Sequence, residues 1–165
     1  IVGQDFSPAL FEIDQAGPRA GSGALIQWTG LATADAEFTK GFLVLATASG
    51  AKAKWKAVVS EFQFPRFSLR SQMRAIVYGR YKFARYFAVT DHHTPKDYNE
   101  LLGRNDLELY DTWEDPDENY NLAQDASLHK PIIIALNDKL NALIRAEVGQ
   151  DTGQHLPSFE FFWKG

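Results

Sequence analysis

The sequence contains no cysteine among its 165 residues. Disulfide bonds, thiolate metal sites and a cysteine nucleophile are therefore excluded for this chain. The absence assigns no compartment, because a protein without cysteine is equally stable in the reducing bacterial cytoplasm and in the oxidising periplasm. Long apolar runs are missing as well. No stretch approaches the ~20 consecutive apolar residues that a membrane-spanning helix needs, so we expect no membrane partner.

The chain also lacks an excess of basic residues. It carries 17 Lys and Arg against 21 Asp and Glu, a net charge of −4, which gives no attraction to nucleic acid. Residues 80–86 do mix basic and aromatic side chains, as platforms for single-stranded nucleic acid do. A strand that turns one aromatic face toward a core produces the same string. In an acidic chain the core interpretation is favoured, and we expect no nucleic-acid partner.

The composition is that of a folded protein of ordinary domain size. Apolar residues make up 45% and aromatic residues 13% of the sequence, enough for a real core in a chain of this length. The sequence begins at Ile1 and shows no signal-peptide pattern, so we expect further sequence upstream.

Several segments predict β-strands. Residues 23–28 read as a buried strand, and residues 73–77 and 81–87 read as a hairpin joined by a short turn that contains Gly79. A further strand is expected at 107–111, after a polar loop at 90–102. Consecutive strands of this kind predict a small antiparallel sheet. The apolar run 42–48, the segment 51–61 and the aromatic tail 159–163 remain undecided between strand and helix or between edge strand and buried tail.

A long amphipathic helix is predicted near the C-terminal end. Ser127 is a suitable cap, Pro131 suits an early turn, and Gly149 suits the stop. The predicted inner face repeats every three to four residues and comprises Ile133, Leu136, Leu140, Leu143, Ile144 and Val148. The residues predicted to point away from it are Asn137, Asp138, Lys139, Asn141 and Arg145. The expected fold class is therefore α+β, with the sheet packed against this helix.

An acidic, proline-centred segment separates the last strand from the helix. It contains Asp106, Glu108, Asp111, Glu114, Asp115, Asp117 and Glu118. Their spacing is not that of a calcium-binding EF-hand loop, and Pro116 stiffens the middle, so we expect a solvated turn and no metal site.

The same segment resembles the C-terminal signature of the sulfatases. That signature reads roughly Glu-Leu-Tyr-Asp, then Asp-Pro-x-Glu, then Asn-Leu-Ala, and here it falls at residues 108–111, 115–118 and 121–123. The hairpin at 74–87 is similar to one that sulfatases place before it, and residues 3–10 are similar to the stretch that closes their catalytic domain. The likeness is strongest over residues 104–149.

This resemblance implies the C-terminal part of a type I sulfatase of the alkaline-phosphatase superfamily. Residues 1–70 would be the end of the catalytic domain and its connection, and residues 71–165 the sheet-and-helix subdomain. The parent would hydrolyse small sulfate monoesters with calcium, or a similar divalent cation, and a formylglycine. The chain contains neither the Cys/Ser-x-Pro-x-Arg motif that yields formylglycine nor the family's paired metal-binding Asp. We therefore expect no catalytic residue, metal ligand or cofactor here, and a partner in the N-terminal catalytic part.

Because C-terminal subdomains of sulfatases border the substrate pocket, the resemblance makes Arg85, His92 and His93 candidates for contacts to the sulfate or to the rest of the substrate. The two histidines are adjacent, and neither a strand nor a helix would aim both at one metal. A hydrogen-bonded loop without a ligand is the alternative interpretation. For the whole chain, two other functions stay open: a fragment of a phosphonate monoester or phosphodiester hydrolase, and a stand-alone binding module without catalysis.

Overall fold

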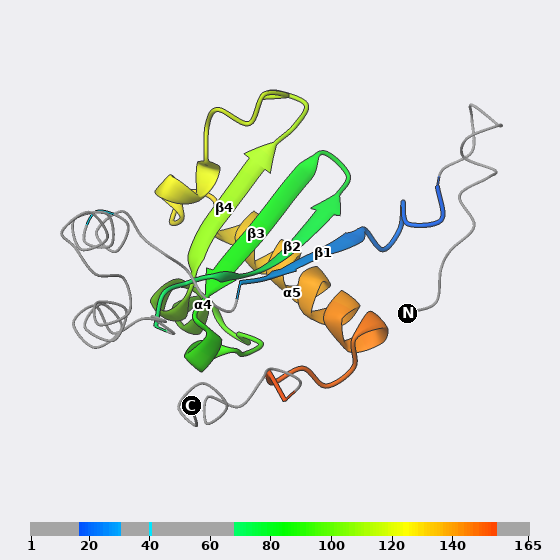
Figure 1. Ribbon diagram of the computed structural model, residues 1–165. Coiled ribbons are helices and arrows are strands. Elements are labelled where there is room, and N and C mark those ends of the chain that lie inside the picture. The colour runs from blue at the N-terminus through cyan, green and yellow to red at the C-terminus, as the bar shows by residue number, and fades with distance from the viewer. Residues whose placement is uncertain (1–16, 31–39, 41–67, 155–165) are drawn as a thin grey trace, which may run out of the picture.

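The computed structural model describes residues 17–30, 40 and 68–154 (Figure 1). In this part of the chain four strands form one antiparallel sheet in the order β1-β2-β3-β4. They are β1 Ala24–Thr29, β2 Gln72–Tyr78, β3 Tyr81–Phe87 and β4 Asp106–Asp111. The predicted α+β class and small antiparallel sheet are thus confirmed. The predictions for residues 3–10, 42–48, 51–61 and 159–163 lie outside the described residues.

The β2–β3 hairpin has the predicted turn. Tyr78 pairs with Tyr81, which leaves Gly79 and Arg80 as the two turn residues. Gly79 has φ +57°, a left-handed conformation that glycine adopts without the steric cost that a Cβ brings. The tight turn fixes the register, so Arg74 lies directly opposite Arg85 and Ile76 directly opposite Phe83.

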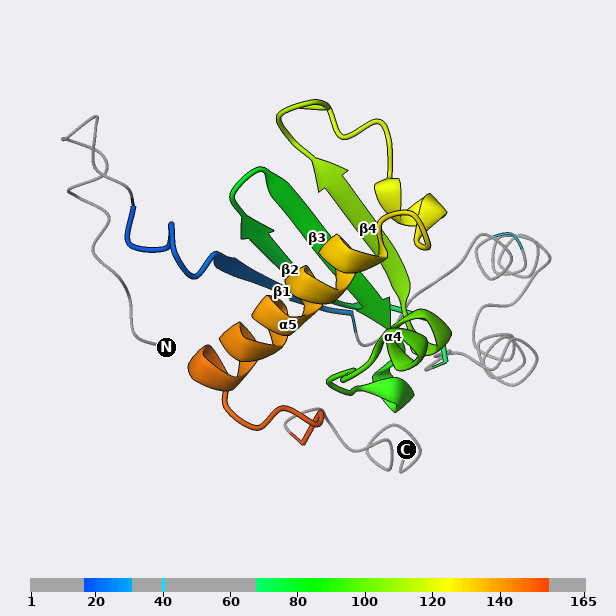
Figure 2. The same cartoon turned by 180° about the vertical axis from the view of Figure 1, so that it is seen from behind.

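Helix α5, Lys130–Glu147, lies across one face of the sheet, as the view from behind shows (Figure 2). Its apolar stripe meets the side chains that the central strands turn toward it. The buried cluster comprises Ile76, Phe83, Leu101, Leu109, Ile133, Leu136, Leu140, Leu143 and Ile144. Removing a side chain of this size from water stabilises the fold by roughly 1.5–3 kcal/mol. The sheet and the helix therefore depend on each other for most of their stability.

The ends of α5 agree with the prediction in part. Pro131 lies in the first turn, and Gly149, with φ +90°, follows the C-terminal cap. The predicted cap Ser127 is wrong, because the helix begins two residues later than that cap implies, with His129 at the cap position. Val148 was wrongly placed on the inner face, since it is 39% exposed.

Strand β1 is less buried than the sequence predicted. The strand predicted at 23–28 exists, but it pairs only with β2 in the described sheet, and it leaves Ile26 and Trp28 exposed at 40% and 56%. The register turns these two side chains to the face of the sheet opposite α5, where the helix does not cover them. β1 also belongs to the same sheet as the strands of the predicted C-terminal subdomain.

The loop predicted at 90–102 contains two short helices instead. They are η1, Val89–Asp91, and α4, Tyr98–Arg104. Asp97 caps α4 by accepting a hydrogen bond from the Glu100 amide, while the Glu100 side chain accepts one from the Lys96 amide. Leu101 anchors the short helix in the core. No helix among the described residues has the length and apolar character needed to cross a membrane.

Candidate functional site

The candidate site lies where β2 and β3 face α5. Arg74 and Arg85 are cross-strand partners on the face of the sheet that carries Ile76 and Phe83 toward the helix. Side chains directly opposite each other in an antiparallel pair are close neighbours. Arg85 is 0% exposed and Arg74 is 6% exposed, so two guanidinium groups are buried side by side.

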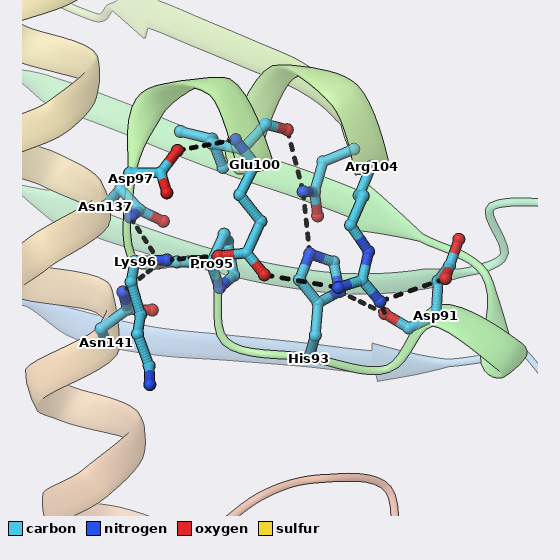
Figure 3. A network of polar contacts seen from close by, with 11 residues as sticks. Asp91, His93, Pro95, Lys96, Asp97, Glu100, Arg104, Asn137 and Asn141 are labelled. Carbon is cyan, nitrogen blue, oxygen red and sulfur yellow. Dashed lines mark hydrogen bonds and ion pairs between the residues drawn. The ribbon is translucent and has the colours of Figure 1, made fainter.

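Arg85 joins three elements through a compact set of hydrogen bonds. Its Nη1 donates to Oδ1 of Asn137 at 2.5 Å and to Oδ1 of Asn141 at 2.7 Å. Both amides in turn donate from Nδ2 to the carbonyl oxygen of Pro95, at 3.1 and 2.8 Å. Figure 3 shows the two asparagines extending from the helix to Pro95. This network holds the 92–97 segment against both β3 and α5.

The two asparagines correct the predicted helix faces. Both were expected to point away from the sheet, yet Asn137 and Asn141 are 3% and 5% exposed. They lie one turn apart beside the apolar stripe, and there they meet Arg85 instead of an apolar side chain. A buried amide is tolerated when its donors and acceptors are paired, as they are here.

Arg74 connects the strands to the segment that follows α5. Its Nη2 donates to Oδ2 of Asp151 at 2.7 Å and lies 3.2 Å from Nε2 of His92. Its guanidinium also lies 5.8 Å from the centroid of the Phe87 ring. Burial alone would raise the pKa of the Asp151 carboxyl. The hydrogen bond from Arg74 and the charges of His92 and Arg74 outweigh burial and lower that pKa.

The two histidines differ in their surroundings. Nε2 of His92 lies 3.2 Å from Nη2 of Arg74 and 3.5 Å from Oδ1 of Asp151. Because a guanidinium only donates, the shorter contact favours the neutral form with its ring proton on Nδ1. His93 donates from Nδ1 to the carbonyl oxygen of Asp91, while its Nε2 accepts from the Asn105 amide at 3.2 Å. Burial lowers the pKa of both rings below the ordinary value of 6.5, and nearby arginines act in the same direction. Both histidines are therefore neutral at pH 7.

The cluster carries more positive than negative charge. Among the described residues, the one carboxylate bonded to either arginine is Asp151, which binds Arg74 and also lies 3.5 Å from Nε2 of His92. Burial, followed by the charge of Arg74, lowers the pKa of Arg85 to about 9. Arg85 is thus still protonated at neutral pH, in a position where a buried charge is costly unless it is paired.

The structure brings two of the three predicted site residues into one cluster. Arg85 lies beside Arg74, and Arg74 contacts His92, whereas His93 turns toward Asp91 and Asn105. Arg85 does not reach the surface. The assignment of the three residues to substrate contacts remains a prediction.

Four members of this site were not predicted from the sequence: Arg74, Asn137, Asn141 and Asp151. A signal existed for Arg74: alternation along the hairpin places it on the same face as Ile76, where a core residue is expected. No pattern in the sequence joins Asp151 to Arg74, because the two lie 77 residues apart.

The acidic signature segment forms a separate, hydrogen-bonded turn at the other end of β4. Asp111 accepts from Nε of Arg80 at 2.6 Å, and Lys82 contacts Glu118 at 2.6 Å. Within the described ranges no group of three or more His, Asp or Glu side chains is arranged to hold a metal ion.

Comparison with known proteins identifies no relative: no family model, no curated protein and no solved structure matches this chain.

Proposed function

We propose that this chain is the C-terminal sheet-and-helix part of a type I sulfatase-like enzyme that hydrolyses sulfate monoesters. Its role in that enzyme is structural, and the 88–97 segment supplies one wall of the substrate pocket. The proposal rests on the resemblance of residues 104–149 to the sulfatase signature. The strongest structural support is that polar residues of that signature hydrogen-bond to the backbone of their own segment.

Two of those polar residues, Asn121 and Asp115, form hydrogen bonds to backbone groups of the same segment. Asn121 accepts from the Leu109 amide at 3.0 Å and donates to the Leu107 carbonyl at 3.0 Å, which braces β4, and it also caps the short helix η2, Leu122–Asp125. Asp115 accepts from the Tyr120 amide at 2.8 Å. These bonds give a physical reason for Asp and Asn at these spacings, without any part in chemistry. A signature of this kind fits a subdomain that supports a catalytic part located elsewhere.

The open face of the sheet supports the same proposal. The register places Ile26, Trp28 and Val77 on the side opposite α5, where they are 40%, 56% and 37% exposed. Adjacent exposed apolar side chains of this size are typical of a surface that packs against another part of a protein. We assign this face to packing against the catalytic part of the enzyme.

The chemistry of the proposed reaction is supplied by groups that this chain does not contain. Calcium and formylglycine would activate the ester in the parent, and the described residues offer no ligand set for the cation. The contribution of this chain is therefore positional. Arg85 would act from behind the wall by fixing Pro95. His92, whose side chain is 6% exposed, would act beside it, and His93 lies in the same half-buried segment.

The test is the activity of the complete gene product. We expect hydrolysis of 4-nitrophenyl sulfate, with weaker hydrolysis of a phenylphosphonate monoester and of bis(4-nitrophenyl) phosphate. A preference for either phosphorus ester would replace the sulfatase by the related hydrolase. No hydrolysis of any of the three would favour the stand-alone binding module.

The wall is tested by variants of the same enzyme. His92→Ala, His93→Ala and Arg85→Ala should raise KM more than they lower kcat, because they alter the fit of the substrate and leave the reacting groups intact. His129→Ala, at the start of α5, is the control and should leave both constants unchanged. Unchanged KM and kcat in all three test variants would refute the proposal that the 88–97 segment forms a wall of the substrate pocket.

A further inference from the structure

The buried cluster around Arg74, Arg85 and His92 contains nitrogen atoms without an acceptor. Among the described residues no partner exists for Nε and Nη2 of Arg85, for Nε of Arg74, or for Nδ1 of His92. Buried polar groups in native proteins are almost always paired, and each exception calls for a cause. Four such atoms in one cluster therefore indicate that something which accepts hydrogen bonds is missing.

All four atoms are donors. The guanidinium nitrogens of arginine carry protons at neutral pH and accept nothing. Nδ1 of His92 is a donor in the tautomer in which Nε2 accepts from Arg74 at 3.2 Å, and Nε2 also lies 3.5 Å from Oδ1 of Asp151. The three side chains are also neighbours, since Arg74 lies opposite Arg85 in the sheet and 3.2 Å from His92. The missing partner must therefore be rich in acceptors.

The surplus positive charge of the cluster indicates that the missing hydrogen-bond acceptor is an anion. Asp151 is the one carboxylate in hydrogen-bond contact with these three side chains in the described part of the molecule, and it binds Arg74. The neighbouring acids Asp91 and Glu100 are paired with Arg104. Water molecules could accept the hydrogen bonds, but they would leave the surplus positive charge of Arg85 uncompensated.

We propose that Arg74, Arg85 and His92 form a binding site for a small tetrahedral oxyanion, a sulfate or phosphate group. Such a group offers several acceptor oxygens and a negative charge, and guanidinium groups bind it through charge-assisted hydrogen bonds. Asp151 then shares Arg74 with the anion and competes with it. Replacing this carboxylate by the neutral amide of the same shape should tighten anion binding.

The oxyanion site involves the same cluster as the proposed function, but it stands on the hydrogen bonds and charges of this chain alone. It requires no sulfatase activity, and its test needs no catalytic part. A negative result would leave the proposed pocket wall to be decided by the KM measurements above. A positive result would not by itself make the parent a sulfatase.

The site can be observed directly through the Nε–H signals of arginine in a proton–nitrogen correlation spectrum of the 165-residue chain. Sodium sulfate is added to tens of millimolar while sodium chloride keeps the ionic strength constant. We expect saturable shifts of the Arg74 and Arg85 signals. Asp151→Asn should lower the half-saturating concentration several-fold, because it removes the competing carboxylate.

Matched variants separate the site from general effects of salt. Arg85→Lys should abolish the saturable shift of Arg74, whereas Arg145→Lys, on the exposed side of α5, should retain it. Should Arg85→Lys fail to fold, Arg74→Lys serves the same purpose with the Arg85 signal as the readout. Inorganic phosphate and methyl sulfate form parallel arms. Binding of the inorganic ions alone indicates a free anion, and binding of methyl sulfate indicates an ester group.

The proposal is overturned if neither the wild-type chain nor Asp151→Asn shows a saturable shift. It is also overturned if chloride at equal ionic strength reproduces the shifts. The first result would mean that water satisfies the four donors, and the second that the shifts report a general effect of salt and no oxyanion site.

Discussion

Asn137 and Asn141 make the same two hydrogen bonds, and this redundancy gives a sharp prediction. Each amide accepts from Nη1 of Arg85 and donates to the carbonyl of Pro95. In Asn137→Ala or Asn141→Ala the remaining amide still serves both partners. We therefore expect each single variant to lower the free energy of unfolding by about 1–2 kcal/mol, near the lower end of the worth of a hydrogen bond to a charged group, because the other amide remains.

The double variant should be disproportionately unstable. It removes both described acceptors of the buried Arg85 guanidinium, and a buried charge that loses its partner costs about 3–5 kcal/mol. It also leaves the Pro95 carbonyl unpaired, at about 1–3 kcal/mol. The double variant should therefore lose about 2 kcal/mol more than the sum of the two single variants.

Urea unfolding, followed by circular dichroism and tryptophan fluorescence, measures these values. Asn99→Ala, an exposed asparagine on α4 with no hydrogen bond to its side chain among those described, is the matched control and should change stability by less than about 0.5 kcal/mol. If the double variant lost only the sum of the two single losses, the shared network would be refuted and the two amides would act independently.

Three further predictions concern the core, the hairpin turn and the dependence on pH. Leu140→Ala should cost about 2–5 kcal/mol in urea unfolding, because Leu140 is 0% exposed, whereas Leu128→Ala, at a side chain 74% exposed, should cost less than about 0.5 kcal/mol; equal losses would contradict the assigned core. Gly79→Ala should lower the thermal midpoint, since φ is +57° there and no atom lies within 4 Å of an added Cβ, so the loss measures backbone strain; an unchanged midpoint would contradict the left-handed turn. The free energy of unfolding should fall as the pH is lowered from 7 to 5, because folding lowers the pKa values of His92 and His93 and the unfolded chain therefore takes up protons first. The double variant with Gln at both positions should show a flatter profile of stability against pH. A profile identical to that of the wild type would contradict the burial of the two histidines.

The hairpin and the long helix could be predicted because their signals are local. Alternating aromatic and β-branched residues flank a glycine turn, and apolar residues recur along α5 at helical spacing. The end of the helix was predictable from Gly149, but its start was not. Ser127 had the residue type of a cap, yet η2 and the turn after it occupy this part of the chain. Residue type alone does not say which of several polar residues the chain selects as a cap.

The buried polar network could not be read from the sequence, because it depends on pairings between distant elements. Asn137 and Asn141 look like solvent-facing helix residues until Arg85 is known to lie opposite them. Arg85 is one of the polar residues on an otherwise apolar strand face, and its burial follows only from the position of α5. Asp151 joins the site through a tertiary contact with Arg74 that no local pattern encodes.

The short helix α4 was missed although a signal was present. Asp97 and Glu100 have the spacing of a helix N-terminus, but the seven-residue helix is too short to show apolar periodicity. Its stability comes from the cap and from Leu101 in the core, not from helix propensity.

The central claim, that this chain is the C-terminal part of a sulfatase-like enzyme, is tested most directly by sequencing the gene upstream of the codon for Ile1. The account predicts an open reading frame that continues upstream and encodes a Cys/Ser-x-Pro-x-Arg motif preceded by a pair of Asp residues. A reading frame that starts shortly before Ile1, or a long upstream region without that motif, would contradict the account.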